Sequence, residues 1–184
     1  MPGSSDDQPV IPENDSYALW IVPEGAAYTL TDGYIVRLSR VYNLPKFEPH
    51  VTLLGGIHAP ETSTLRTLAR SLLPFHIHFS NQPEYLDETF RCLFLKADET
   101  PALLETFARA SQLFGYTGGP YFPHLSLAYG DLPVETKREM IRELGDIPEI
   151  EFEARQLSLV WASTEMPVSS WRVVARFPFA ENAT

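Results

Sequence analysis

The sequence predicts an α+β fold built from two related halves of one domain. Strand-like and helix-like patterns alternate along the 184 residues, and a hydrophobic content of 44% is enough for one sizeable core. Two similar strings, Pro49-His50-Val51-Thr52-Leu53 and Pro123-His124-Leu125-Ser126-Leu127, occupy related places in the two halves. We therefore expect residues 16–184 to form a single bilobal domain, preceded by a flexible tail at residues 1–15.

The first half alternates between strand and helix patterns. An apolar run at residues 16–22 ends at Pro23 and predicts a buried strand. Residues 26–43 have the apolar spacing of a helix, and residues 47–57 form the first motif strand, which ends at paired glycines. Residues 61–73 then predict a second helix. The order is strand, helix, strand, helix.

The second half repeats this alternation. Residues 75–79 alternate between apolar and polar side chains and predict a strand, for which residues 89–97 are the expected partner. Thr100-Pro101 opens a helix that stops at Gly115, because threonine caps helices well and proline is tolerated at the first helical position. The elements that remain are the second motif strand, a helix at residues 133–144, and strands near residues 150–162 and 169–178.

Charge and composition limit the class of partner. The formal net charge is −10, of which Asp6, Asp7, Glu13 and Asp15 in the expected tail supply four negative charges, so −6 remains on the globular part. A negative field repels long polyanions, which disfavours extended nucleic acid and leaves a small phosphate ester as the anionic substrate. We expect a monomer.

Location follows from three features of the sequence. No apolar run is long enough to span a bilayer, and the N-terminus lacks the basic and apolar regions of a signal peptide. The single cysteine, Cys92, cannot form an intrachain disulfide, which suits a reducing compartment. We therefore expect a cytoplasmic protein without a membrane partner.

The two motifs place chemistry on one face of each strand. Side chains alternate between faces in an extended strand, so each histidine and the hydroxyl residue two positions later project the same way. The intervening Val51 and Leu125 then point into an apolar layer. Two copies in two halves suggest that His50, His124 and the two hydroxyls meet across a pseudo-twofold cleft.

Two imidazoles and two hydroxyls can cleave a phosphodiester without a metal. One histidine deprotonates the nucleophile and the other protonates the leaving oxygen, since the ordinary imidazole pKa lies near neutrality. The hydroxyls donate hydrogen bonds to the charged non-bridging oxygens of the transition state. No cofactor is predicted. His76 and His78 could supply two metal ligands, but no third ligand lies nearby in the sequence, so we expect an exposed strand face there.

The paired His-x-Thr/Ser motifs resemble those of the 2H phosphoesterase superfamily, and the match is closest to cyclic nucleotide phosphodiesterases of the plant and yeast type. Similar segments are Tyr17-Ala18-Leu19-Trp20, residues 89–95, Pro120-Tyr121-Phe122-Pro123-His124 and Trp171. The resemblance implies two antiparallel sheets that face a central cleft, with helices outside, and no metal requirement.

Residue by residue, the resemblance implies two catalytic histidines, two phosphate-binding hydroxyls and three aromatic side chains that hold the nucleobase. The histidines are His50 and His124, the hydroxyl residues are Thr52 and Ser126, and the aromatic residues are Trp20, Phe90 and Tyr129. It also implies that His124 is the base and His50 the acid, an order that the spacing alone leaves open. For each aromatic residue, core packing is the alternative.

The favoured activity is hydrolysis of 2′,3′-cyclic nucleotides, or of the ADP-ribose 1″,2″-cyclic phosphate left by tRNA splicing, to the 2′-phosphate or the 1″-phosphate. The alternative enzyme acts on RNA ends or 2′,5′-linked oligonucleotides. A further alternative is a nucleotide-binding module without turnover.

Overall fold

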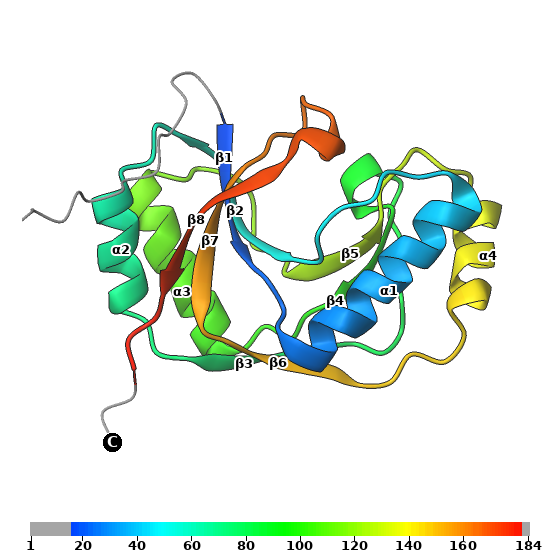
Figure 1. The fold of residues 1–184 in the computed structure, drawn as a ribbon, viewed down its shortest axis with the longest axis horizontal. Helices are drawn as coiled ribbons and strands as arrows, with labels where there is room; N and C mark the ends of the chain where they lie inside the picture. Colours follow the sequence, from blue (N-terminus) through cyan, green and yellow to red (C-terminus); the bar gives the residue numbers. More distant parts are fainter. Residues whose placement is uncertain (1–15, 182–184) are drawn as a thin grey trace, which may run out of the picture.

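The computed structural model describes residues 16–181, and the predicted tail at residues 1–15 lies outside this part of the chain. Its strands are β1 (Ser16–Ile21), β2 (Val51–His58), β3 (Phe75–Phe79), β4 (Leu93–Lys96), β5 (His124–Ala128), β6 (Ile150–Ala154), β7 (Gln156–Trp161) and β8 (Arg172–Pro178). Its helices are α1 (Gly25–Tyr42), α2 (Thr62–Arg70), α3 (Pro101–Phe114) and α4 (Val134–Leu144), with 3₁₀ turns η1 (Thr89–Arg91) and η2 (Val168–Ser170). The predicted α+β class is confirmed (Figure 1).

The strands form two antiparallel sheets, as predicted. The larger has the order β4-β5-β2-β1-β7-β8, and the smaller pairs β3 with β6. The predicted partner of residues 75–79 is wrong, because β3 pairs along its whole length with β6 and only a single bridge, Phe79 to Ala97, links it to residues 89–97. Residues 93–96 pair with the second motif strand instead. Alternation of side chains identifies a strand and its buried face, but it does not select the partner.

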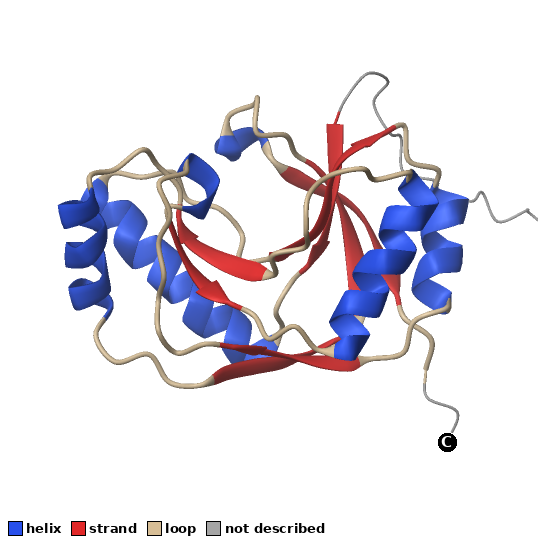
Figure 2. Ribbon diagram, turned by 180° about the vertical axis from the view of Figure 1, so that it is seen from behind, coloured by secondary structure: helices blue, strands red, loops and turns tan. Residues whose placement is uncertain are grey.

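The two motif strands meet in the middle of the larger sheet. β2 and β5 are joined through one backbone pair, Val51 with Leu125, and the sheet continues on one side through β1, β7 and β8 and on the other through β4. Helix α1, from the first half, packs on β5, while α3, from the second half, packs on β2. Figures 1 and 2 show α1 with α4 on one side of the molecule and α2 with α3 on the other. The two halves therefore support each other's motif strand.

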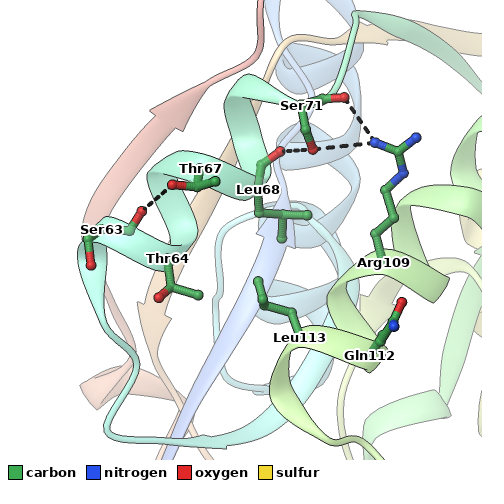
Figure 3. A pocket seen from close by; sticks show the side chains of 8 residues that line it. All are labelled: Ser63, Thr64, Thr67, Leu68, Ser71, Arg109, Gln112 and Leu113. Atoms are coloured by element: carbon green, nitrogen blue, oxygen red, sulfur yellow. Dashed lines mark hydrogen bonds between the residues drawn. The ribbon is translucent and has the colours of Figure 1, made fainter.

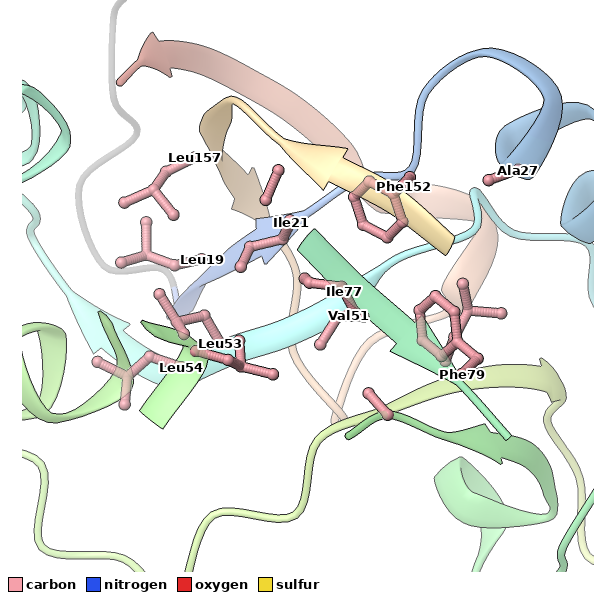
Figure 4. Packing of buried hydrophobic residues seen from close by; sticks show 14 of the residues in the cluster. Leu19, Ile21, Ala27, Val51, Leu53, Leu54, Ile77, Phe79, Phe152 and Leu157 are labelled. Carbon is pink, nitrogen blue, oxygen red and sulfur yellow. The ribbon is translucent and has the colours of Figure 1, made fainter. Parts of the chain in front are cut away.

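The apolar residues of the motifs anchor these strands in the core. Val51, Leu53, Leu125 and Leu127 are essentially inaccessible to solvent, and Val51 and Leu53 pack with residues of β1, β3 and β6 (Figure 4). Burying such a side chain contributes about 1.5–3 kcal/mol to folding, so the register that places them in the core is strongly favoured. The same register turns the histidine and hydroxyl positions to the opposite face.

The helix ends follow the sequence signals. The Thr100 hydroxyl accepts a hydrogen bond from the Leu103 amide at 3.3 Å, and α3 stops at Gly115, whose φ of 61° is readily adopted by glycine. Within residues 16–181, none of the helices has the length and apolar character needed to cross a membrane.

Candidate active site

A cavity of about 490 Å³ lies over the two motif strands, within the usual size range of small-molecule sites. His50, Thr52 and His124 line it, so the structure brings three of the four predicted motif side chains together. The three predicted aromatic residues, Trp20, Phe90 and Tyr129, line it as well. Arg91, Tyr116, Phe122, Trp171 and residues 162–164 complete most of its wall.

His50 is held in one tautomer and in one plane. It directly precedes β2, and its Nδ1 atom lies 2.6 Å from the Glu48 carbonyl oxygen, so Nδ1 carries the proton and donates a hydrogen bond to that oxygen. Nε2 is then an acceptor and lies 3.4 Å from the Tyr129 hydroxyl. The ring stacks on Trp20, with centroids 3.6 Å apart and planes only 5° from parallel.

The surroundings of His50 oppose a positive charge. Its exposed fraction is 4%, and this burial lowers its pKa from 6.5 to about 3, although the Glu48 carbonyl acts in the other direction. The neighbouring His124 makes the smallest contribution to this lowering. His50 is therefore neutral in the free protein near pH 7.

His124 has the same backbone contact in a different setting. Its Nδ1 atom lies 2.8 Å from the Phe122 carbonyl oxygen, and the rings of Phe94 and Phe122 lie 5.4 Å away. Burial lowers its pKa, the Phe122 carbonyl opposes this, and Arg91 lowers the pKa a little more. The lowering is smaller than at His50, since His124 is only half-buried in the fold. His124 accepts a proton more readily.

The two hydroxyl positions differ. Thr52 is half-buried and lines the cavity. Ser126 is buried, and its Oγ atom donates a hydrogen bond to the Phe90 carbonyl oxygen at 3.1 Å. Ser126 is not among the side chains that line the cavity. Its hydroxyl would have to leave the carbonyl before it could donate to a phosphate.

The aromatic residues surround the cavity unevenly. Trp20 and Tyr129 are buried, and each already has one face covered, Trp20 by His50 and Tyr129 by Phe47 with centroids 3.9 Å apart. Phe90 is half-buried and lies 5.8 Å from Trp171, nearly parallel to it at 26°. The sequence marks Trp171 only as a point of resemblance, and no pattern in it places that side chain in the cavity.

The long charged side chain in the cavity wall is positive. Arg91 is the single lysine or arginine among the described residues that line it, and none of these residues is a carboxylate. The sequence offers Arg91 as one of four cations that could face a second phosphate, with Arg37, Arg40 and Lys46, but it does not orient them. The structure places only Arg91 of these four in the wall, on the turn η1 that replaces the start of the strand expected at residues 89–97. A wall with two histidines, one arginine and no carboxylate suits an anionic ligand.

A larger cavity, of about 690 Å³, lies between α2 and α3 and has a structural explanation (Figure 3). Thr67 and Ser71 direct their hydroxyls to carbonyl oxygens of α2 itself, at 3.0 and 2.7 Å. Arg109 donates to the Ser71 carbonyl at 3.1 Å, near the end of that helix. These groups satisfy helix ends, and no histidine lines the cavity.

The other reactive side chains stay apart from the site. His76 and His78 are exposed on β3 and lie 3.9 and 3.1 Å from Glu151 of β6. Within residues 16–181, no group of three histidine, cysteine or acidic residues is arranged to hold a metal ion. Cys92 is buried, and burial raises the pKa of its thiol.

Comparison with known proteins assigns the family. A sequence model of the 2′-5′ RNA ligase superfamily matches residues 29–165, which contain both histidine motifs. The chain belongs to this superfamily. The predicted resemblance to the 2H phosphoesterases is thereby confirmed.

Relatives and solved structures agree with this assignment. A cyclic phosphodiesterase of Arabidopsis thaliana is 25% identical over 171 residues, which cover 89% of this chain and 94% of the relative. The apo structure of Escherichia coli LigT has a TM-score of 0.59 at 12% identity, over 92% of this chain and 99% of LigT. A Thermus thermophilus protein has a TM-score of 0.56 at 18% identity, over 89% and 97% of the two chains. These two structures confirm the bilobal fold.

Proposed function

We propose that the protein hydrolyses 2′,3′-cyclic nucleotides, or ADP-ribose 1″,2″-cyclic phosphate, to the 2′-phosphate or the 1″-phosphate without a metal ion. The family and the cyclic phosphodiesterase relative identify a phosphodiesterase, and the substrate is what the proposal adds. The observation that carries it is the pair of histidines, His50 and His124, in one nucleotide-sized cavity with each Nδ1 bonded to a main-chain carbonyl.

The two histidines divide the proton transfers. Because each Nδ1 proton is directed to a carbonyl, Nε2 is the atom of each ring that exchanges a proton with water or substrate. The resemblance implies that His124 is the base. The electrostatics of the free protein support the opposite order, since His50 is the more strongly neutral ring and His124 takes a proton first.

In the mechanism we propose, neutral His50 accepts a proton from the attacking water, and protonated His124 donates one to the departing 3′ oxygen. His50 becomes positively charged only as the reaction proceeds, and the attraction between that charge and the stacked Trp20 ring then offsets part of the cost of charging a buried imidazole. This attraction is absent in the ground state, where the ring is neutral.

The remaining groups bind the phosphate and the base. The Thr52 hydroxyl is placed to donate to a non-bridging oxygen, and Ser126 joins it if its hydroxyl turns away from the Phe90 carbonyl. Phe90, with Trp20 and Tyr129, supplies aromatic surface for the nucleobase. Stacking of this kind contributes about 1–3 kcal/mol per base in single-strand binders.

The alternative activities have less support. Action on RNA ends or 2′,5′-linked oligonucleotides calls for contacts along a polyanion, whereas this chain carries a net charge of −10 and its cavity one arginine. A binding module without turnover has no need of two histidines held in the same tautomer.

We propose that the protein acts in the cytoplasm as a monomer on a small-molecule substrate.

The test is an assay of the purified protein in EDTA with three substrates: 2′,3′-cyclic AMP, ADP-ribose 1″,2″-cyclic phosphate, and an RNA oligonucleotide with a cyclic phosphate end. We expect turnover of the first two to the 2′-phosphate and the 1″-phosphate, identified by phosphorus NMR. The double variant His50→Ala, His124→Ala is the control for contaminating activity. Activity that disappears on chelation and returns with zinc or manganese contradicts the proposal, and turnover of the oligonucleotide alone supports the RNA-end alternative.

A further inference from the structure

The cavity wall is charged at one end only. The chain has 24 acidic residues, yet no aspartate or glutamate lines the cavity, and Arg91 is the single long cation among the described residues that do. The Arg91 guanidinium lies 5.5 Å from the centre of the Phe122 ring, which itself lies 5.4 Å from His124. Arg91 therefore stands at the His124 end, whereas Trp20 and Tyr129 at the His50 end are uncharged.

A second cation lies behind the Phe122 ring. The Lys96 ammonium lies 5.7 Å from the centre of the same Phe122 ring. Lys96 is the residue of β4 that pairs with His124 of β5, so its position is fixed by the sheet. Lys96 pairs with Glu99 at 3.6 Å and does not line the cavity, so Arg91 is the cation that a ligand in the cavity meets.

The backbone that carries Arg91 is fixed. The Leu86 amide donates to the Arg91 carbonyl at 3.0 Å, and the Arg91 amide donates to the Glu88 carbonyl at 3.2 Å. The buried Lys137 of α4 donates to the Leu86 carbonyl at 2.8 Å and so ties this turn to a helix. The position from which the Arg91 side chain extends is determined by the fold.

The guanidinium itself is available. Its partner is the Glu88 carboxylate, at 2.8 Å from Nε, and the side chains of Arg91 and Glu88 are 36% and 50% exposed. Solvated pairs of this kind add little stability, so a ligand phosphate can replace the carboxylate at low cost. A planar guanidinium matches a terminal phosphate through two parallel hydrogen bonds.

We propose that Arg91 binds a second phosphoryl group of the substrate, and that the preferred substrates are cyclic phosphates with a phosphomonoester or pyrophosphate on the 5′ side. This inference rests on the proposed function, because it places the reacting phosphate between His50 and His124. In this proposal the two histidines and Thr52 serve the reacting phosphate, and Arg91, which lines the cavity beside Phe122, binds the second one. The net negative charge of the chain favours a small ligand with two phosphates over RNA.

The experiment compares kcat/KM for 2′,3′-cyclic AMP with that for its 5′-phosphorylated form. A charge-assisted hydrogen bond predicts a preference of about tenfold or more for the 5′-phosphate in the wild type. Arg91→Gln should remove this preference. Glu88→Gln should keep or increase it, because the competing carboxylate is gone. The matched control is Arg37→Gln, which removes an exposed arginine of α1 that pairs with Glu143, outside the cavity, and should leave both rates and their ratio unchanged.

A binding measurement separates this inference from the proposed function. The dissociation constants of adenosine 2′-phosphate and adenosine 2′,5′-bisphosphate report on Arg91 even if neither cyclic compound is hydrolysed. Intrinsic tryptophan fluorescence follows the binding, because two of the three tryptophans, Trp20 and Trp171, line the cavity. We expect tighter binding of the bisphosphate in the wild type, and a loss of that difference in Arg91→Gln.

Three results overturn the inference. The first is an equal kcat/KM of the wild type for 2′,3′-cyclic AMP and for its 5′-phosphorylated form. The second is an equal loss on both ligands in Arg91→Gln, which would place Arg91 on the reacting phosphate. The third is a larger gain from a dinucleotide with a cyclic phosphate end than from the 5′-phosphate, which would indicate an RNA end.

Discussion

The two motif copies are alike along the chain and different in space. In both, the histidine Nδ1 atom binds the carbonyl of the residue two positions earlier, Glu48 for His50 and Phe122 for His124. His50 is covered by Trp20 and is 4% exposed. His124 is half-buried, with Arg91 near the same Phe122 ring.

This difference shows which properties are local and which are not. The Pro-His string sets the tautomer, because the bonded carbonyl belongs to the same short segment in each copy. The pKa depends on side chains from other elements, namely Trp20 of β1 beside His50, and Arg91 of η1 near His124. A duplicated motif thereby acquires two unequal histidines, and an acid–base pair requires unequal partners.

The largest expected effects come from the histidines themselves. His50→Ala and His124→Ala should each lower kcat/KM by about 10²–10⁴-fold, the usual contribution of a general acid or base. The comparison becomes sharper with a cyclic substrate whose 3′ bridging atom is sulfur, because a thiolate leaves without a proton. If His124 is the acid, His124→Ala should be partly rescued on this substrate and His50→Ala should not.

The reverse pattern of rescue would restore the order implied by the family resemblance, with His50 as the acid. Equal rescue of both variants would mean that the unequal pKa values of the free protein do not persist in the complex. Either result leaves the two-histidine mechanism in place.

The hydroxyls should show a smaller asymmetry. Thr52→Ala should lower kcat by about 10²–10³-fold, near the effect of losing one oxyanion donor. Ser126→Ala should cost less, because the Ser126 hydroxyl is engaged by the Phe90 carbonyl at 3.1 Å. Steady-state kinetics on one cyclic nucleotide compare the two variants directly, and equal losses would show that Ser126 turns to the phosphate when substrate binds.

Acid should destabilise the fold through His50. Its pKa is about 3 in the folded protein and near 6.5 when unfolded, so below pH 6.5 the unfolded chain takes up a proton that the folded chain does not. The stability that neutral His50 provides is complete above pH 6.5 and is lost progressively as the pH falls toward 3. At pH 5 the loss is about 2 kcal/mol.

Urea unfolding of the wild type and of His50→Gln at pH 7.5 and pH 5 measures this loss, because the other titrating groups are common to both proteins. The difference in unfolding free energy between them should shift by about 2 kcal/mol, to the disadvantage of the wild type at pH 5. His124→Gln should give a smaller shift. A constant difference would mean that His50 is protonated in the folded protein.

Much of this arrangement could be predicted from period-two patterns. Alternation alone assigns Val51, Leu53, Leu125 and Leu127 to the apolar layer, and all four are buried. The same alternation brings His50, Thr52 and His124 to one cavity. Thr100 and Gly115 bound α3 as expected, because capping depends on adjacent residues.

The rest depends on contacts between distant segments. Alternation could not pair β3 with β6, since it marks a face and not a neighbour. It could not show that Ser126 donates to the Phe90 carbonyl, or that Trp20 lies flat on His50. Sequence patterns place Arg91 in a strand, whereas the structure places it in the turn η1. Two main-chain hydrogen bonds hold this turn, from the Leu86 amide to the Arg91 carbonyl and from the Arg91 amide to the Glu88 carbonyl, and no local sequence pattern predicts them.

The smallest expected effect concerns the Tyr129 hydroxyl, which lies 3.4 Å from His50 Nε2. Within residues 16–181, no side-chain hydroxyl makes the equivalent hydrogen bond to His124. Burial raises the pKa of Tyr129, so this hydroxyl stays protonated and donates to the neutral ring. A long neutral hydrogen bond is worth about 0.5 kcal/mol. Tyr129→Phe should therefore raise the His50 pKa by about half a unit or less and change kcat about twofold, with KM unchanged.

Tyr129→Ala is the matched comparison, because it also removes the ring that packs on Phe47 and lines the cavity, and it should raise KM. Histidine NMR titration and steady-state kinetics measure both quantities. If Tyr129→Phe instead raises KM and leaves kcat and the His50 titration unchanged, the hydroxyl binds substrate and does not hold His50. The difference between the two histidines would then rest on burial and on Trp20.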